Sequence, residues 1–453
     1  MNTLPLLPDS ASRKTTPTKP FAVTARAPVV IVGADADGLG IARGLGRAGV
    51  PVILVDTDAR RPGMHSRYVR PFVVTAMSGS ALIDGLLLLR ERLKATPLLF
   101  LTTDPQVHTI SEHRQRLAGA FCIRLPGRDC IRELLHKLTF QHLAERHGFP
   151  VPRAIGVSGE KDFVTFSEIS FPAVIKPGNK EFFFSSKAPR AQKVWSRREA
   201  EAVCKAILLK APDLIVQEWV EGDDSDIYFC LQYRGEDGLP VSSFTGRKLR
   251  CWPPQTGSTA SCTAAPEVAA VLERLTKEFF DKTQLVGMCS MEFKQDRRNG
   301  KLFMIEPTVG RADWQEEVAA MNGVNIPLAA YHHELGLPLP TIERPHSPVI
   351  WMYPPACLRS IFCAQSSPDR RPGAQARMKS PCWSLDDAIP SAFFVAEWIR
   401  KLWSPARWRE LICERRQVRD AASVIAADVG QEKASAAGAG VSRPPVPPEA
   451  LSR

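Results

Sequence analysis

Two glutamates that flank a polar turn, Glu292 and Glu306, are the residues of this chain whose spacing most directly indicates chemistry. Residues 289–294 alternate apolar and polar side chains, and residues 301–306 resume extended character after the polar run 296–300. The pattern predicts a β-hairpin with one acid on each strand. Two carboxylates brought together in this way could hold a divalent cation.

The register of the hairpin decides whether the two acids meet. A loop of three or five residues centred on Asn299 places Glu292 directly opposite Glu306, whereas a two-residue turn at Asn299 and Gly300 places Glu292 opposite Pro307. Facing carboxylates cost up to about 1 kcal/mol unless a cation lies between them. Magnesium suits this position because it takes one or two carboxylates and completes its shell with waters and phosphate oxygens. Two acids beside a turn also fit an ordinary solvated face.

The composition limits the classes of protein that the remaining elements can build. A chain of 453 residues with 44% hydrophobic and 24% charged residues is typical of a soluble globular protein with two or three domains. No apolar run approaches the roughly 20 residues that span a bilayer, so we expect no transmembrane segment. Eleven cysteines without a C-x-x-C pair favour reduced thiols and a cytoplasmic location. The net charge is +11, but the basic residues are dispersed without a nucleic-acid-binding motif, so we do not expect nucleic acid as a partner.

The first structured segment resembles a nucleotide-binding unit in layout but not in charge. Residues 1–27 are rich in Pro, Ser, Thr and Lys and are predicted to be disordered. Residues 28–56 then give an apolar strand, a glycine turn at Gly33, a helix and a second apolar strand, the βαβ order of a Rossmann-type domain. This order raises the alternative of an NAD(P) oxidoreductase. However, Asp35 replaces the middle glycine of the G-x-G-x-x-G fingerprint and Asp37 lies beside it, so carboxylates stand where a pyrophosphate would approach.

Several basic residues lie on or at the ends of the elements predicted between residues 129 and 250. A helix that starts at Asp129 and stops at Gly148 carries Lys137, and the strand FPAVIKP carries Lys176 just before its last proline. A strand over residues 214–220 leads into an acidic turn, and the segment GRKLR follows two further strands.

In their order, these pieces resemble the ATP-grasp superfamily of carboxylate-amine and carboxylate-thiol ligases, and within it the D-aspartate ligase and carboxylate-amine ligase group. The matching segments are the Lys137 helix, FPAVIKP, IVQEWVEGDD, GRKLR, MEF with FMIEPT, and MNGVNIP. The resemblance implies a multidomain α/β and α+β fold, in which a Rossmann-like pre-ATP-grasp domain precedes a two-lobed ATP-grasp domain. The implied divisions are a disordered tail at 1–27, the pre-ATP-grasp domain at 28–128, the ATP-grasp domain at 129–340 with lobes at about 150–220 and 221–340, an extension at 341–429 and a disordered tail at 430–453.

The resemblance also implies which residues bind the phosphates of ATP. Lys137 and Lys176 would hold the α- and β-phosphates, and Lys187 would close over them from a loop. That loop departs from the usual glycine-rich form because it carries three phenylalanines at 182–184.

By the same resemblance, the base and the ribose would lie against the strand that joins the lobes. Gln217, Trp219 and Val220 would contact the adenine, and Asp224 would bind the ribose hydroxyls. Trp219 also fits a plain core position, and solvated lysines remain the alternative for the phosphate-binding pair.

The implied reactive centre combines metal-binding oxygens with two cations. Glu292, Glu306 and Thr308 would bind Mg²⁺, with Thr308 standing where the superfamily usually has asparagine. Lys248 would face the γ-phosphate or the substrate carboxylate. Arg311 would neutralise an acyl phosphate or bind a carboxylate, and its alternative role is a salt bridge with Asp313 in the same loop.

The reaction implied is formation of an acyl phosphate from ATP and a carboxylate, followed by attack of an amine. A catalytically silent ATP-binding module remains an alternative, favoured by Thr308 and the glycine-poor loop, and an NAD(P) oxidoreductase is a third. Residues 393–413 mix tryptophans with basic residues and could pack on the body of the protein, dock a partner or contact a membrane surface. A homodimer is left open.

Overall fold

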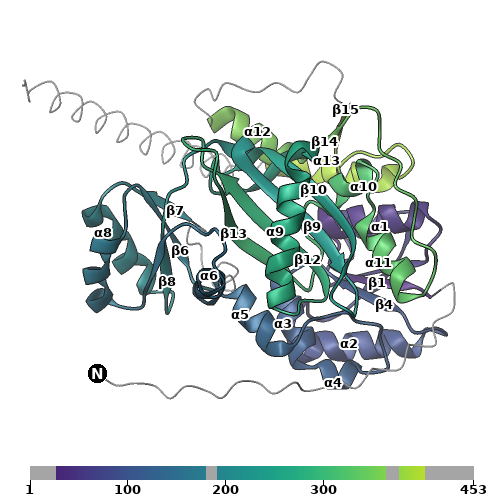
Figure 1. Ribbon diagram of the computed structural model, residues 1–453. Helices are drawn as coiled ribbons and strands as arrows, with labels where there is room; N and C mark the ends of the chain where they lie inside the picture. The colour runs from purple at the N-terminus through teal and green to yellow at the C-terminus, as the bar shows by residue number, and fades with distance from the viewer. Residues whose placement is uncertain (1–26, 180–190, 364–376, 403–453) are drawn as a thin grey trace, which may run out of the picture.

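The computed structural model describes residues 27–179, 191–363 and 377–402. These residues form three β-sheets with helices against them (Figure 1). Within the same ranges, no helix is both long enough and apolar enough to cross a membrane.

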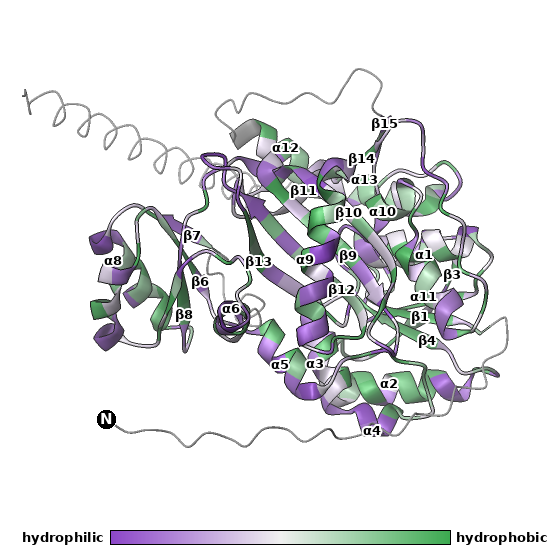
Figure 2. Ribbon diagram, viewed as in Figure 1, coloured by the Kyte–Doolittle hydropathy of each residue, from purple (hydrophilic) through white to green (hydrophobic). Residues whose placement is uncertain are grey.

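The first sheet contains four parallel strands in the order β3–β2–β1–β4. The elements of this part are β1 Val29–Val32, α1 Ala36–Arg47, β2 Val52–Asp56, η1 Pro62–His65, β3 Val69–Val73, α2 Gly79–Glu91, β4 Leu98–Leu101, α3 Asp104–Glu112 and α4 Arg114–Leu117. Every residue of β1 and β4 is buried, and both strands are apolar throughout (Figure 2). Alternate residues of β1 join two different cores, one with α1 and one with α2, so both faces of the sheet are covered.

The turn after β1 requires glycine for steric reasons. Gly33 has a φ of +114°, and a Cβ at Gly38 would lie 1.9 Å from the Gly33 carbonyl oxygen. The glycines predicted to open the βαβ unit are therefore explained by close packing between the turn and α1.

The second sheet is antiparallel, with strand order β5–β8–β6–β7. Its elements are β5 Ala154–Val157, η2 Glu160–Glu168, β6 Ala173–Pro177, β7 Gln192–Val194, α8 Arg197–Leu208 and β8 Leu214–Glu218. Ser196 accepts a hydrogen bond from the backbone N–H of Glu199 and caps α8, as its side-chain chemistry favours. Figure 1 shows this sheet and α8 as a lobe beside β13.

The third sheet has seven strands in the order β13–β12–β9–β10–β11–β14–β15. Its elements are η3 Asp224–Asp226, β9 Ile227–Arg234, β10 Pro240–Trp252, β11 Ser258–Ala264, η4 Pro266–Val268, α9 Ala269–Lys282, β12 Gly287–Gln295, β13 Leu302–Val309, α10 Glu316–Met321, α11 Ile326–Glu334, β14 Val349–Met352, α12 Pro354–Cys363 and β15 Arg377–Lys379. Alternate residues of β9 pack with α9 in one core and with α10 and α11 in another. Because side chains alternate between the two faces of a strand, both faces of the sheet are buried at β9.

The helix predicted from Asp129 to Gly148 is wrong in one respect, because it is two helices. These are α5 Arg128–Leu135 and α6 Lys137–Arg146, separated by an extended His136 with ψ of 124°. His136 forms a β-bridge with Asn179, and its imidazole lies 2.7 Å from the Asp213 carboxylate. Long-range partners of one residue therefore interrupt a helix that local periodicity favours.

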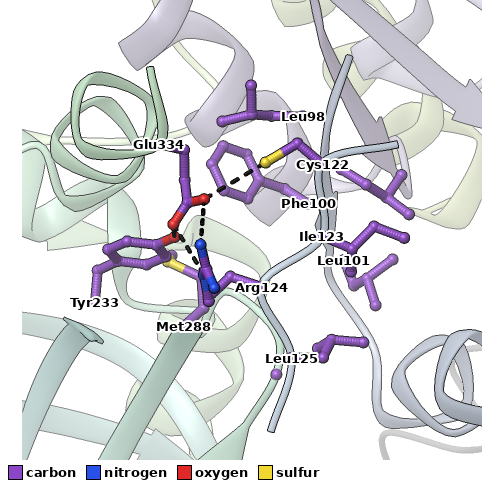
Figure 3. Close-up of a pocket in the computed structure, with 12 residues that line it drawn as sticks. Leu98, Phe100, Leu101, Cys122, Ile123, Arg124, Leu125, Tyr233, Met288 and Glu334 are labelled. Carbon is purple, nitrogen blue, oxygen red and sulfur yellow. Dashed lines mark hydrogen bonds and ion pairs between the residues drawn. The ribbon is translucent and has the colours of Figure 1, made fainter. Parts of the chain in front are cut away.

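A small buried network joins the first sheet to the third (Figure 3). The Glu334 carboxylate accepts hydrogen bonds from Arg124 at 2.8 and 3.0 Å and from the Tyr233 hydroxyl at 2.6 Å. Burial disfavours the charged carboxylate, but Arg124 outweighs it and lowers the pKa of Glu334. The cavity beside the network measures about 20 Å³, which is too small for an organic ligand. We interpret it as a structural junction.

The segment after β15 packs on the first βαβ unit. It contains α13 Ala388–Leu402, and just before this helix Asp387 forms a fully buried ion pair with Arg43 of α1 at 2.8 Å. Phe393 stacks on His65 with the ring centroids 3.8 Å apart. Phe393 and Phe394 thus pack against the body of the protein, as one of the three interpretations expects, whereas Ile399 is exposed and residues 403–413 lie outside the described part.

Candidate functional site

A cleft of about 440 Å³ lies where the three sheets meet, and a smaller pocket of about 80 Å³ adjoins it. Lys176 and Glu292 line both hollows. The large cleft is also lined by Lys137, Lys248, Glu306, Thr308 and Arg311, and the small pocket by Gln217, Trp219 and Val220. The structure therefore brings together ten of the twelve residues that the sequence analysis selects, from elements up to 174 residues apart (311 − 137).

The two glutamates lie directly opposite each other on β12 and β13, which is one of the two registers that the sequence leaves open. The turn, however, does not supply this register. Gln295 pairs with Leu302, which leaves an even number of residues in the loop, and a register shift beyond Phe293 then makes Ile305 the extra residue. This β-bulge moves Glu306 into line with Glu292. A bulge is thus the device that places both carboxylates on one face of the sheet.

Lys248 of β10 lies against one of these acids. Its Nζ is 2.5 Å from Glu292 Oε2, and its side chain is 5% exposed. Burial disfavours the ammonium, but the Glu292 carboxylate outweighs burial and raises the pKa of Lys248 above its ordinary value. The protein therefore supplies a cation beside its own carboxylate pair, and charge repulsion between the acids is not by itself a reason to require a metal.

The donor atoms at this point still fit magnesium. Two carboxylates on a shared face and the Thr308 hydroxyl offer oxygen ligands alone, which Mg²⁺ prefers. Thr308 donates its proton to Asp313 at 3.0 Å, so the lone pairs of its oxygen face away from that bond. Among the described residues there is no cluster of three or more His, Cys, Asp or Glu side chains suited to a metal. Phosphate oxygens would have to complete the shell.

Two lysines that are expected to bind phosphate are positioned by contacts with the second sheet or the loop that follows its strand β6. Lys137 opens α6, and its backbone N–H donates to the Gly178 carbonyl at 2.9 Å. Lys176 Nζ donates to Gln217 Oε1 at 3.2 Å, and Gln217 Nε2 donates in turn to Gln141 at the same distance. This chain of bonds fixes the predicted Lys176 and Gln217 relative to each other. Gln141 is missed by the sequence analysis, although it lies one helical turn after Lys137.

The other residues predicted to bind the nucleotide fall into three groups. Trp219 and Val220 line the small pocket, and their contact with adenine stays a prediction. Asp224 is not among the described residues that line the cleft or the small pocket. Its carboxylate accepts the backbone N–H groups of Cys251 and Gln255 at 2.7 and 2.6 Å and so holds the turn between β10 and β11. Lys187 lies outside the described residues.

Arg311 reaches the first sheet and does not form the loop salt bridge considered as its alternative. Its Nε is 2.5 Å from Asp104 Oδ1, at the start of α3, whereas Asp313 accepts hydrogen bonds from Ser290 at 2.6 Å and from Thr308. Asp104 outweighs the effect of burial and raises the pKa of Arg311 above its ordinary value. This pair connects the acid hairpin to the first sheet, and no local sequence signal indicates it.

The end of the cleft near Arg311 is acidic. Asp37, Asp104 and Asp313 line it together. Burial and the neighbouring Asp35 raise the pKa of Asp37 to about 6, against the opposing effect of a hydrogen bond from the Gly38 backbone N–H. The cleft is therefore cationic at its lysine end and anionic at the end formed by α1 and α3.

Comparisons with known proteins show the fold. Neither models of protein families nor curated sequences give a match. Among solved structures, the chain resembles N5-carboxyaminoimidazole synthetase from Staphylococcus aureus complexed with ADP, with 14% identity, a TM-score of 0.57 and coverage of 72% of this chain and 81% of that one. It resembles N5-carboxyaminoimidazole ribonucleotide synthetase from Thermus thermophilus with 19% identity, a TM-score of 0.54 and coverage of 71% and 82%. For biotin carboxylase from Campylobacter jejuni the values are 14%, 0.54, 71% and 74%.

These neighbours are ATP-grasp proteins. The likeness covers more than two thirds of each chain, and it confirms the ATP-grasp fold that the order of motifs predicts. Because fewer than one residue in five is identical, the comparison shows the fold and does not identify the substrates.

Proposed function

We propose that this protein is an ATP-dependent, Mg²⁺-requiring ligase that joins a carboxylate to an amine through an acyl phosphate. The observation that carries the proposal is one cleft in which three lysines face a pair of opposed glutamates. A triphosphate needs fixed cations along its length, and this fold brings them from both lobes to one place.

The roles of the residues follow from their positions. Lys137 and Lys176 would bind phosphate oxygens, and Glu292 and Glu306 would hold magnesium, which would neutralise charge on the phosphates when bound. Lys248 lies beside Glu292, and its ammonium would bind the γ-phosphate. Because Lys137 opens a helix and the other four groups are held by β-strands, they can orient a carboxylate for in-line attack on the γ-phosphate without a covalent enzyme intermediate.

The acidic end of the cleft fits the amine substrate. Asp37 and Asp313 would attract an ammonium group, and the carboxylate form of Asp37 can take a proton from it before attack. Arg311 bonds Asp104 at this end of the cleft and would bind the carboxylate or the acyl phosphate.

The first βαβ unit fits a pre-ATP-grasp domain better than a dinucleotide site. Asp37 accepts the Gly38 backbone N–H at 2.8 Å, and Asp35 is bonded to Arg61 at 2.8 Å. Both carboxylates stand at the N-terminus of α1, where a pyrophosphate would need to bind. We therefore propose the division into a Rossmann-like domain at 28–128, a two-lobed ATP-grasp domain at 129–340 and an extension at 341–429, and we disfavour the NAD(P) oxidoreductase.

A phosphate-release screen over amino acids tests the proposal against the silent module. The ligase should release phosphate from MgATP when both a carboxylate and an amine are present, and omission of either should abolish turnover. Binding of MgATP by calorimetry without turnover in any pair would favour the silent module. Absence of MgATP binding would refute both.

A further inference from the structure

Lys294 is a buried lysine whose ammonium is left unpaired by the part of the chain that the structure describes. Its residue is 6% exposed, and its Nζ has no hydrogen-bond partner among the described residues. A buried ammonium with three unused donors is costly. Such a group either destabilises the fold without benefit or serves a ligand that brings acceptors.

The side chain lines the small pocket that adjoins the proposed phosphate site. Lys294 lies two residues after Glu292 on β12, so both side chains leave the same face of the strand. Lys294 and Trp219 line the small pocket, whereas Lys137 and Lys248 line the large cleft. Lys294 is therefore separated from Lys137 and Lys248, whereas Lys176 lines both hollows and lies where they adjoin.

The surroundings of Lys294 do not fully compensate its positive charge. Its Nζ lies 4.1 Å from the centroid of the Trp219 ring, and Lys193 Nζ lies at the same distance from that ring. Lys193 has a carboxylate within reach, because Glu221 Oε1 is 3.9 Å away.

We propose that Lys294 recognises the nucleotide base by donating a hydrogen bond to a ring nitrogen of a purine in the small pocket. The inference rests on the proposed function, because it takes the large cleft as the site of the phosphates. An aromatic ring and a hydrogen-bond donor at one wall match a purine, which has a flat face and unprotonated ring nitrogens at its edge. The base then satisfies a donor that the described residues leave unpaired.

The test is calorimetric titration of the full-length chain with MgATP, three deaza analogues (1-, 3- and 7-deaza-ATP) and inorganic triphosphate. Lys294→Met removes the ammonium and keeps an unbranched side chain of similar length. The matched control is Lys205→Met, which removes an exposed lysine of α8 that forms a salt bridge with Glu160. Lys294→Met should weaken MgATP binding about 10-fold or more, as expected for loss of a charged hydrogen bond. Its affinity for inorganic triphosphate should stay within about twofold of wild type.

One deaza analogue should bind wild type and Lys294→Met equally, because it lacks the acceptor. Lys294→Met should also unfold at a higher temperature than wild type without nucleotide, which shows that the loss of affinity is not a loss of folding. Equal weakening of MgATP and triphosphate would overturn the proposal and assign Lys294 to the phosphates. Unchanged MgATP binding would overturn it as well. If wild type binds no MgATP, the proposed function fails first, and this result is distinguishable from the other two.

Discussion

Removing either partner of the Lys248–Glu292 pair should have unequal effects on stability. Glu292→Gln leaves the Lys248 ammonium in a site where its side chain is 5% exposed, while the Glu292 side chain is 26% exposed. Breaking a fully buried pair in this way costs about 3–5 kcal/mol, and partial exposure of Glu292 brings the expected cost to about 2–3 kcal/mol. Lys248→Met instead leaves Glu292 opposite Glu306, for which the cross-strand penalty is up to about 1 kcal/mol.

Magnesium should rescue one variant and not the other. In Lys248→Met the two carboxylates lack their protein cation, so Mg²⁺ can take its place. At ten times its dissociation constant, the ion would restore about 1.4 kcal/mol. In Glu292→Gln one of the two carboxylates is gone, and Mg²⁺ should change the free energy of unfolding by less than about 0.5 kcal/mol.

Urea unfolding followed by tryptophan fluorescence, with and without MgCl₂ at constant ionic strength, measures both effects. The double variant Lys248→Met/Glu292→Gln completes a thermodynamic cycle and should be more stable than Glu292→Gln alone. Additive losses in the double variant would show that the pair is not coupled. No greater Mg²⁺ effect in Lys248→Met than in wild type would refute the argument that the opposed glutamates form a cation site.

Three further outcomes are expected. Asp37→Asn should raise the KM for the amine and remove its pH dependence, since wild-type KM should rise as the pH falls through about 6, where the buried carboxylate is protonated; steady-state phosphate release measures this. Burial raises the pKa of Glu316 from 4.5 to about 8, so its native carboxyl costs stability progressively from about pH 4.5 upward. Glu316→Gln should match wild type near pH 4 and exceed it at pH 9 in urea unfolding. Arg311→Lys should lower kcat/KM about 10-fold or more, because lysine cannot donate at once to Asp104 and to the Ala312 carbonyl as the guanidinium does, while thermal unfolding changes little.

The sequence predicts the elements whose pattern is local. The apolar runs at Val29–Val32 and Leu98–Leu101 indicate buried parallel strands, and alternation on both sides of a polar run indicates the acid hairpin. Lys176 and Glu292 can be identified because each stands at a fixed place in such an element. Their meeting in one cleft requires the resemblance, since no periodicity relates residues 116 positions apart (292 − 176).

The parts that could not be predicted depend on long-range contacts. The bulge at Ile305 has no local signal, because an isoleucine fits a regular strand equally well. The break at His136 follows from its contacts with Asn179 and Asp213, which the helical stripe does not register. Lys294 could have been noticed, since it shares the strand face of Glu292, but only the structure shows that it is buried without a hydrogen-bond partner among the residues described.

The acid hairpin is held at both ends by different parts of the chain, and this explains why one cleft can be cationic at one end and anionic at the other. Lys248 of the neighbouring strand β10 fixes Glu292, while the loop after β13 docks on the first sheet through the Ala312 N–H and Leu101 carbonyl at 3.0 Å and through the Arg311–Asp104 pair. Lys248 places positive charge beside the hairpin, and Asp104 places negative charge beside it. Under the proposed function, the lysines would draw the triphosphate to one part of the cleft and the aspartates would draw the ammonium substrate to another.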